Sequence, residues 1–362
     1  MGLSRNQFAQ FKEHLQGEEY RRERIPDRNE SQADSLRWQH AMLVGVPHPV
    51  AALPVVIWRP IMKATLRARL FRRDDRDQLT DLVNAHLSAA IPGARVSVNA
   101  VLTSLERQPE EYVVDPWVVE RTTIVVEQDD RLVAAAHLHR FADRPRVGHE
   151  YRGTGLLQWF LSLPHGDAGE QVADALMQAC LAQLRAWSVP VAYADGQLPF
   201  PGVYGIPSSW PHVREALVRG GFSHDGSTET VLMATTARLA VGAKSSSSSK
   251  LVLVRELGAD GICFVAKQSS EKLGYLEVDL TVNRAERHSV GVRLAELSDW
   301  DASDSEVLRR LVAELSDWLA LSDVDRVIAA IDFDDAEKRA SLMELGFVEV
   351  TSTSRGWRRD RF

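Results

Sequence analysis

The sequence has few cysteines and no long apolar run. Cys180 and Cys263 are the only cysteines, and they lie far apart without the spacing of metal ligands or of a disulfide framework. We therefore expect two buried, reduced thiols. The most apolar early stretch, residues 41–61, is interrupted by four prolines. No stretch reaches the ~18 apolar residues of a membrane span, so we expect no membrane partner.

Clusters of one charge sign are also missing. The chain carries 50 acidic and 43 basic residues, a net charge of −7, and the two signs are interspersed. This pattern argues against a nucleic-acid partner or a membrane surface. The start of the chain is rich in charge and has no apolar signal core, so we expect a cytoplasmic protein.

What is present is ordinary globular composition, with 44% hydrophobic and 26% charged residues in a chain of 362. At ~100–200 residues per domain, this length predicts two domains. Five consecutive serines at 245–249 predict a flexible linker over residues 241–250. The linker separates a domain at 62–240 from one at 251–362.

Residues 1–61 differ from the rest, because polar residues and a proline-broken apolar stretch match neither a helix nor a strand period. Two interpretations stay open. Either Met62 is the natural start, and the segment before it is a poorly ordered extension, or the segment is an N-terminal arm that packs on the first domain.

The two domains show the same order of predicted elements, which indicates an internal repeat. Each has a β-hairpin, a strand, an amphipathic helix, a strand, a second helix ended by glycine, and a last strand opened by phenylalanine. In the first domain these are residues 121–138, 156–163, 169–187, 189–194, 210–219 and Gly221-Phe222. In the second they are residues 261–282, 290–297, 305–318, 324–331, 336–345 and Gly346-Phe347.

This order, with the helix–Gly–Phe–strand ending in both halves, resembles the Gcn5-related N-acetyltransferase (GNAT) superfamily. The segment Gly202-Val203-Tyr204-Gly205-Ile206-Pro207 with Trp210-Pro211-His212 looks like a branch frequent in actinobacteria. The resemblance implies an α/β (α+β) fold of two tandem GNAT-like domains, each a mixed, mostly antiparallel sheet flanked by helices. It also implies acetyl-CoA as co-substrate and a small-molecule or peptide amine as acceptor.

GNAT proteins hold the cofactor pyrophosphate on backbone N–H groups where a helix follows a strand, a favourable place for an anion. Here the resemblance assigns that loop to His165, Gly166, Asp167, Ala168 and Gly169. It lacks the usual arginine and carries carboxylates that would oppose the ligand. The resemblance places the oxyanion donor, a backbone N–H, at Leu161, Ser162 or Leu163.

The second domain has three aspartates and no glycine in its corresponding loop, residues 298–305. An anion site is disfavoured there on electrostatic grounds, and we expect this copy to be degenerate and non-binding.

Candidates for proton transfer depart from the family pattern. Many members place a proton-donating tyrosine where this chain has Leu217 and Leu342. Tyr204 and His212 are the replacement candidates for the acid, although each could simply pack a loop or a cap.

Glu127 is a candidate base, as are His137 and His139. The two histidines alternate on the hairpin and share one face, which we expect to be solvent-exposed; in that case they have no role. Among the tryptophans, Trp187 and Trp318 are expected in the core, and Trp159 and Trp210 nearer a cleft.

Three functions remain open from the sequence. The first is an N-acetyltransferase that transfers an acetyl group from acetyl-CoA to a primary amine through the first domain. The second is a catalytically silent GNAT-like protein that binds a ligand or partner, favoured by the acidic loops and the missing tyrosines. The third is a tandem acyltransferase similar in arrangement to mycothiol synthase, which needs both halves for one substrate.

Overall fold

The fold is described by a computed structural model that covers residues 66–106, 117–163, 166–200, 204–242, 251–259, 261–280 and 293–360, with side chains undescribed at 166–168 and 240–242. The N-terminal extension, most of the serine linker and His165 lie outside these residues. None of the described helices is long and apolar enough to cross a membrane.

The first sheet has six strands in the order β1-β2-β3-β4-β5-β14. They are β1 (Leu66–Leu70), β2 (Val118–Gln128), β3 (Arg131–Phe141), β4 (Gly155–Ser162), β5 (Val191–Ala194) and β14 (Trp357–Asp360). Neighbours pair antiparallel except β4 and β5, which run parallel. Around this sheet are η1 (Arg73–Asp75), α2 (Arg76–Ala90), α3 (Val98–Leu105), η3 (His149–Tyr151), α4 (Gly166–Ala186) and α5 (Pro211–Arg219).

The second sheet has eight strands in the order β6-β13-β7-β12-β11-β10-β9-β8. They are β6 (Ile206–Pro207), β7 (Thr228–Thr235), β8 (Val252–Leu257), β9 (Ile262–Gln268), β10 (Glu271–Asp279), β11 (Leu294–Ala302), β12 (Arg326–Asp332) and β13 (Val348–Ser354). Its parallel pair is β11 and β12. Its helices are α6 (Thr236–Gly242), α7 (Ser305–Leu321) and α8 (Ala336–Glu344). Two mixed, mostly antiparallel sheets flanked by helices confirm the predicted fold class.

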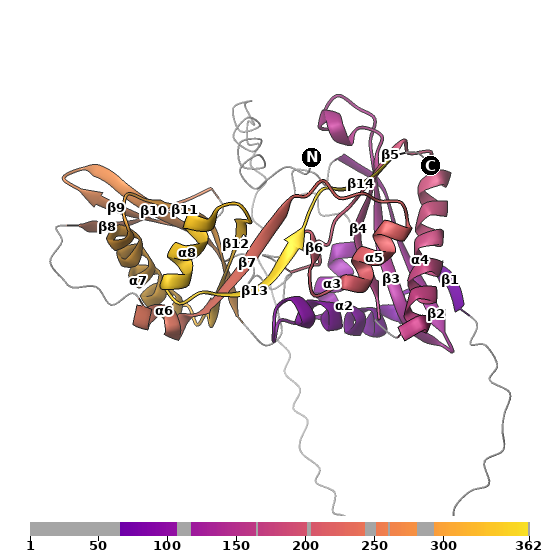
Figure 1. The fold of residues 1–362 in the computed structure, drawn as a ribbon, viewed down its shortest axis with the longest axis horizontal. Helices are drawn as coiled ribbons and strands as arrows, with labels where there is room; N and C mark the ends of the chain where they lie inside the picture. Colours follow the sequence, from indigo (N-terminus) through magenta and orange to yellow (C-terminus); the bar gives the residue numbers. More distant parts are fainter. Residues whose placement is uncertain are drawn as a thin grey trace, which may run out of the picture. The chain divides into compact units, whose positions relative to one another are not determined.

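Three strands lie in the sheet of the other half: β6 and β7 in the second sheet, and β14 in the first. β7 follows α5 in the chain, where the predicted repeat places the last strand of the first sheet. It lies instead in the second sheet between β12 and β13, and β14, near the chain end, pairs with β5 of the first sheet (Figure 1). Each sheet is therefore completed by a strand from the other side of the serine linker, and the predicted domain boundary does not separate the sheets.

Local signals account for the helix ends. Asp304 caps α7 by accepting from the N–H groups of Glu306 and Val307. Gly221 and Gly346 follow α5 and α8 with φ of +79° and +101°, a conformation that favours glycine. The structure thus confirms the predicted helix–glycine endings in both halves.

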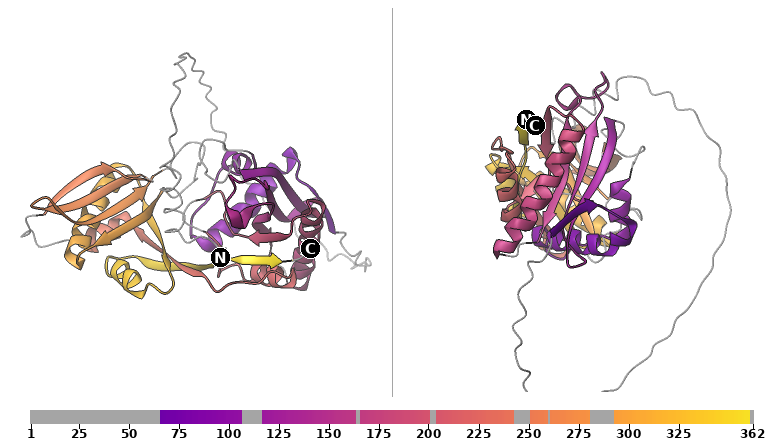
Figure 2. Two further views of the ribbon diagram at one scale, coloured as in Figure 1. Left: turned by 90° about the horizontal axis from the view of Figure 1, so that it is seen from above. Right: turned by 90° about the vertical axis from the view of Figure 1, so that its right-hand side faces the viewer.

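The first core is closed on both faces of its sheet, with α4 over one face and α2 and α3 over the other (Figure 2). Its buried cluster also includes Val231, Leu294 and Ile328 from the second sheet. Because apolar contacts continue from one half into the other, the two halves pack as one structure rather than as separate globules.

Candidate functional site

The parallel pair of the first sheet opens at a bulge in β4. Pairing with β5 ends at Leu157↔Ala194, and Gln158 has no partner in the register with β3 because Leu138 pairs with Leu157 and His137 with Trp159. Past the bulge β4 continues along β3 as far as Ser162. Among the described strands, therefore, none pairs with the last residues of β4 on the side that faces away from β3.

Backbone direction distinguishes among the three predicted oxyanion donors. Leu163 donates its N–H to the Val133 carbonyl of β3, at 3.1 Å. Since alternate residues of a strand point their N–H groups to opposite sides, Leu161 also faces β3, and Ser162 faces the open edge. The N–H of Phe160 points to the same side as that of Ser162. Phe160 is therefore a further candidate for the oxyanion donor, which only the register of the sheet reveals.

The predicted cofactor loop is shorter than expected. Gly166, Asp167, Ala168 and Gly169 form the first turn of α4 rather than a loop. The first four N–H groups of a helix have no partner within it, so the helix itself leaves the N–H groups of these four residues without an intrahelical acceptor. The helix starts four residues after β4 ends, which brings those donors close to the open edge of β4.

His212 and Ser162 are brought together, with a partner that the sequence analysis missed. The Nε2 of His86, on α2, lies 3.0 Å from the Ser162 carbonyl oxygen and 3.4 Å from His212 Nε2. The His86 Nδ1 lies 2.9 Å from the Leu82 carbonyl oxygen. His86 lies four residues after Leu82 on a buried helix face, and this sequence position gave no indication that it would contact the site.

Both rings of this pair are held neutral. Burial lowers the pKa of His86 to about 4, although the Leu82 and Ser162 carbonyls oppose the shift. Burial also lowers the pKa of His212, against the effect of the same Ser162 carbonyl. A neutral imidazole is a poor proton donor, so the shift weakens the case for His212 as the acid at neutral pH.

Trp210 closes this region from the α5 side. Its ring is 1% exposed, meets His86 edge-on with centroids 5.3 Å apart, and donates its Nε1–H to the His86 carbonyl at 2.9 Å. Trp159 is equally buried, in β4. The two tryptophans expected nearer a cleft therefore line the inside of the first half.

Tyr204 lies in the loop between β5 and β6 and is half-buried. Its ring centroid is 6.0 Å from the guanidinium carbon of Arg355, which comes from the end of the chain. The loop begins at the residue after β5, beside the bulge of β4, so the second acid candidate belongs to the same end of the parallel pair as the bulge.

Glu127, the predicted base, lies apart from these residues. It is in β2, two strands from β4, which at the usual strand spacing is about 10 Å. Arg69 binds both Glu127 and Asp75, at 2.6 and 2.7 Å, and all three side chains are largely buried. This geometry is that of a structural ion-pair network.

The face that carries His137 and His139 is buried, so the expectation of a solvent face was wrong. They are 1% and 9% exposed, with ring centroids 4.8 Å apart, and His137 Nδ1 lies 2.8 Å from Thr123 Oγ1. Burial lowers the pKa of both rings, that of His137 to about 3. Their Nε2 atoms have no hydrogen-bond partner.

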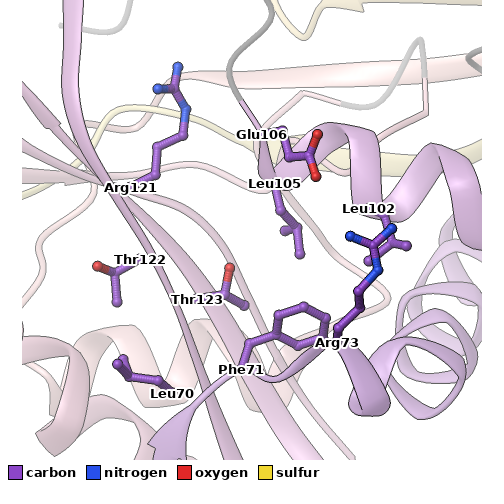
Figure 3. Close-up of a pocket in the computed structure, with 9 residues that line it drawn as sticks. All are labelled: Leu70, Phe71, Arg73, Leu102, Leu105, Glu106, Arg121, Thr122 and Thr123. Carbon is purple, nitrogen blue, oxygen red and sulfur yellow. The ribbon is translucent and has the colours of Figure 1, made fainter.

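A cavity of about 360 Å³ opens where β1 ends, beside β2 and the end of α3 (Figure 3). Arg121 and Arg73 lie on opposite sides of it, with Phe71 and Leu105 between them. None of the predicted site residues lines it. It adjoins β2, which lies two strands from β4 in the sheet.

The second half repeats the bulge without the helix donors. β11 pairs with β12 as far as Leu297↔Ala329, and Ser298 is bulged out of the register with β10. β11 then continues to Ala302, so the predicted loop from Ser298 is largely strand. At the start of α7 the side chain of Asp304 already occupies two N–H groups.

The cysteines and the remaining tryptophans follow the predicted burial only in part. Cys180 is fully buried and Cys263 half-buried, and burial raises the pKa of both thiols. Trp187 is 8% exposed in the core, whereas Trp318 is half-buried against the second cluster.

Comparisons with known proteins identify the fold. No protein-family model matches the sequence, and no curated protein does. Among solved structures, a tandem GNAT protein from the clavulanic acid biosynthesis pathway, determined without acetyl-CoA, matches with a TM-score of 0.51 and 16% identity, over 82% of this chain and 98% of that one. A GCN5-related glucosamine N-acetyltransferase region of a fungal multi-domain β-N-acetylglucosaminidase matches with a TM-score of 0.49 and 15% identity, over 82% of this chain and 38% of that one.

At these identities the likeness concerns the fold alone. The match to the tandem protein extends over nearly the whole of its chain, and both parallel pairs here carry the bulge described above. The chain therefore has the fold of the tandem GNAT proteins.

Proposed function

We propose that the protein is an N-acetyltransferase that binds acetyl-CoA in its first half and acetylates a primary amine. The observation that carries the proposal is the bulge at Gln158, where β4 leaves β5, followed directly by the α4 start at Gly166. This arrangement offers open backbone donors along a strand edge and an anion-binding helix start beside them.

The reaction needs few side chains. The acceptor amine attacks the thioester carbonyl; a C–N bond forms and the C–S bond breaks. The developing oxyanion would be held by the N–H of Phe160 or Ser162 on the open edge of β4. The proton lost from the amine passes to water or a base, and the leaving thiolate takes a proton from an acid. Of the two candidates, Tyr204 suits this role better than the neutral His212.

Calorimetric titration of the full chain with acetyl-CoA tests the binding step. The full chain is required, because a fragment starting at residue 250 would lack β7 and leave the second sheet incomplete. We expect one site. Asp167→Lys should tighten binding by about fivefold, since it replaces a negative charge by a positive one in the first turn of α4. The matched change Asp301→Lys, on exposed β11, should leave affinity unchanged.

Release of free thiol in the presence of a panel of primary amines tests the transfer. Tyr204→Phe should reduce kcat by roughly 10²-fold if the phenol is the acid, and His212→Gln by much less. Absence of acetyl-CoA binding, or an equal response to Asp167→Lys and Asp301→Lys, would contradict the proposal.

One observation favours a second candidate, a silent acyl-CoA-binding protein. Leu217 and Leu342 are fully buried where the family resemblance expects a tyrosine, and His86 already contacts the Ser162 carbonyl on the open edge of β4. Acetyl-CoA binding without thiol release across the amine panel would support this alternative.

A further inference from the structure

The loop that holds Tyr204 is anchored at the bulge of β4. Asp195 donates its N–H to the Leu157 carbonyl at 2.9 Å, and Gln197 donates to the Gln158 carbonyl at 3.1 Å. The residues that follow β5 thus run beside the point where the parallel pair opens. Asp195 Oδ1 also accepts a hydrogen bond from the N–H of Gly205 at 2.8 Å, so the residue after Tyr204 is bound to the residue that follows β5.

The far end of the loop is held by the end of the chain. Ile206 and Pro207, the two residues of β6, pair with Ser354 and Thr353 of β13. Gly205 has φ of +90°, and a Cβ there would lie 2.7 Å from both the Ser354 carbonyl oxygen and the Arg355 side chain. Only glycine allows this approach, so the backbone next to Tyr204 is in close contact with residues 354–355.

Arg355 lies between this loop and the second sheet. Its side chain is 19% exposed and binds the buried Glu229 carboxylate at 2.6 Å, while its guanidinium carbon lies 6.0 Å from the Tyr204 ring centroid. Burial lowers the pKa of Arg355, but the carboxylates of Glu229 and Asp195 more than offset this, and its net pKa is raised. The guanidinium is therefore a fixed cation at one side of the tyrosine.

We propose that Arg355 is a positioning residue for Tyr204, with Glu229 holding the guanidinium in place. The inference rests on the proposed function, in which Tyr204 protonates the thiolate. Glu229 lies in β7, before the serine linker, and Arg355 lies between β13 and β14, after it. A residue from beyond the serine linker thus contributes to the proposed site of the first half.

Steady-state kinetics with a matched control variant distinguishes a loss of Tyr204 positioning from a general loss of structure. Arg355→Gln with Glu229→Gln removes both members of the ion pair, so that the buried Glu229 carboxylate is not left without its partner. We expect kcat to fall about tenfold with KM unchanged. Arg358→Gln is the control, because the Arg358 guanidinium carbon lies 5.9 Å from the Tyr193 ring in the same chain end; it should leave kcat unchanged.

The decisive comparison uses Tyr204→Phe as background. If Arg355 acts through the phenol, adding Arg355→Gln and Glu229→Gln to Tyr204→Phe should cause no further loss of kcat. A further tenfold loss in that background, or an equal loss in Arg358→Gln, would overturn the inference.

A spectroscopic readout keeps the inference testable without turnover. In protein labelled with ¹³C-tyrosine, the Tyr204 ring signal, assigned by its loss in Tyr204→Phe, should shift in the Arg355→Gln, Glu229→Gln variant and stay in place in Arg358→Gln. An unmoved signal overturns the positioning role. A shifted signal without acetyl-CoA binding retains the positioning of Tyr204 and removes the proposed function instead.

Discussion

The two halves share a bulged strand but differ in the helix that follows it. In the first half α4 starts with Gly166 and Gly169 in its first turn, whereas in the second half Asp304 caps α7 with its own carboxylate. The strand bulge is therefore repeated, and acidic residues lie at both helix starts, Asp167 and Glu170 in the first half and Asp304 and Glu306 in the second. The comparison teaches that, within one chain, the same strand bulge can precede a helix start that contains glycines or one that an aspartate side chain caps.

The largest expected effect tests which half the end of the chain stabilises. Trp357 is 4% exposed and belongs to the first core, so Trp357→Ala should lower the free energy of unfolding by about 3–5 kcal/mol. Hydrogen exchange should accelerate in β4 and β5 rather than in β8 and β9. Trp318→Ala, at a half-buried site, is the control and should act on β9, where Trp318 packs against Phe264.

Acid should weaken the first half before the second. The pKa of His86 is lowered to about 4 and that of His137 to about 3 by burial. A lowered histidine pKa means that the folded state binds fewer protons than the unfolded one. The associated stability is present above pH 6.5 and is lost as pH falls toward 4.

From pH 7 to pH 5 this loss should amount to about 2 kcal/mol for His86 alone. Chemical denaturation at several pH values, followed by hydrogen exchange, measures it. His86→Gln should be less stable at pH 7 but show a shallower dependence on pH. The same pH slope in wild type and His86→Gln would rule out His86 as a source of the effect.

A smaller effect is expected at the capped helix of the second half. Asp304→Ala removes the acceptor for the Glu306 and Val307 N–H groups and should cost about 1 kcal/mol in thermal or urea unfolding. The acetyl-CoA stoichiometry should remain one, because Asp299 and Asp301 stay nearby in β11. A second acetyl-CoA site in this variant would show that the Asp304 cap alone prevents the second half from binding acetyl-CoA.

The smallest effect should come from exposed ion pairs of the second half. Arg255 and Glu314 lie 2.8 Å apart with side chains 51% and 30% exposed. Arg255→Gln should change the free energy of unfolding by less than about 1 kcal/mol. Arg69→Gln in the first half is the contrast, because it removes the guanidinium that binds both largely buried carboxylates, Asp75 and Glu127, and should cost about 3 kcal/mol.

Local patterns predicted most elements but little of the site. The strand ending near Ser162, the helix face of α4 and the glycine endings of α5 and α8 follow from apolar periodicity and backbone preference. Asp299 and Asp301 looked like loop residues, yet they belong to β11, because cross-strand contacts such as Tyr275 to Asp299 (2.7 Å) complete a strand with a polar face.

The site depends on contacts that no local pattern carries. His86 meets His212 and Ser162 across 126 and 76 residues of sequence, and the burial of His137 required the helices that cover its face of the sheet. The ion pair of Glu127 with Arg69, 58 residues away in the sequence, likewise has no local signature.

The sequence by itself determined two copies of one order of elements, the glycine ends of their last helices and the acidic character of the second copy's loop. These properties arise from neighbouring residues, whose preferences act at short range. The tertiary structure decided which strand joins which sheet, and so brought Arg355 to Tyr204. Strand pairing is set by which face of each strand is buried and by long-range register. The local sequence of an edge strand such as β14 therefore does not indicate which strand it pairs with.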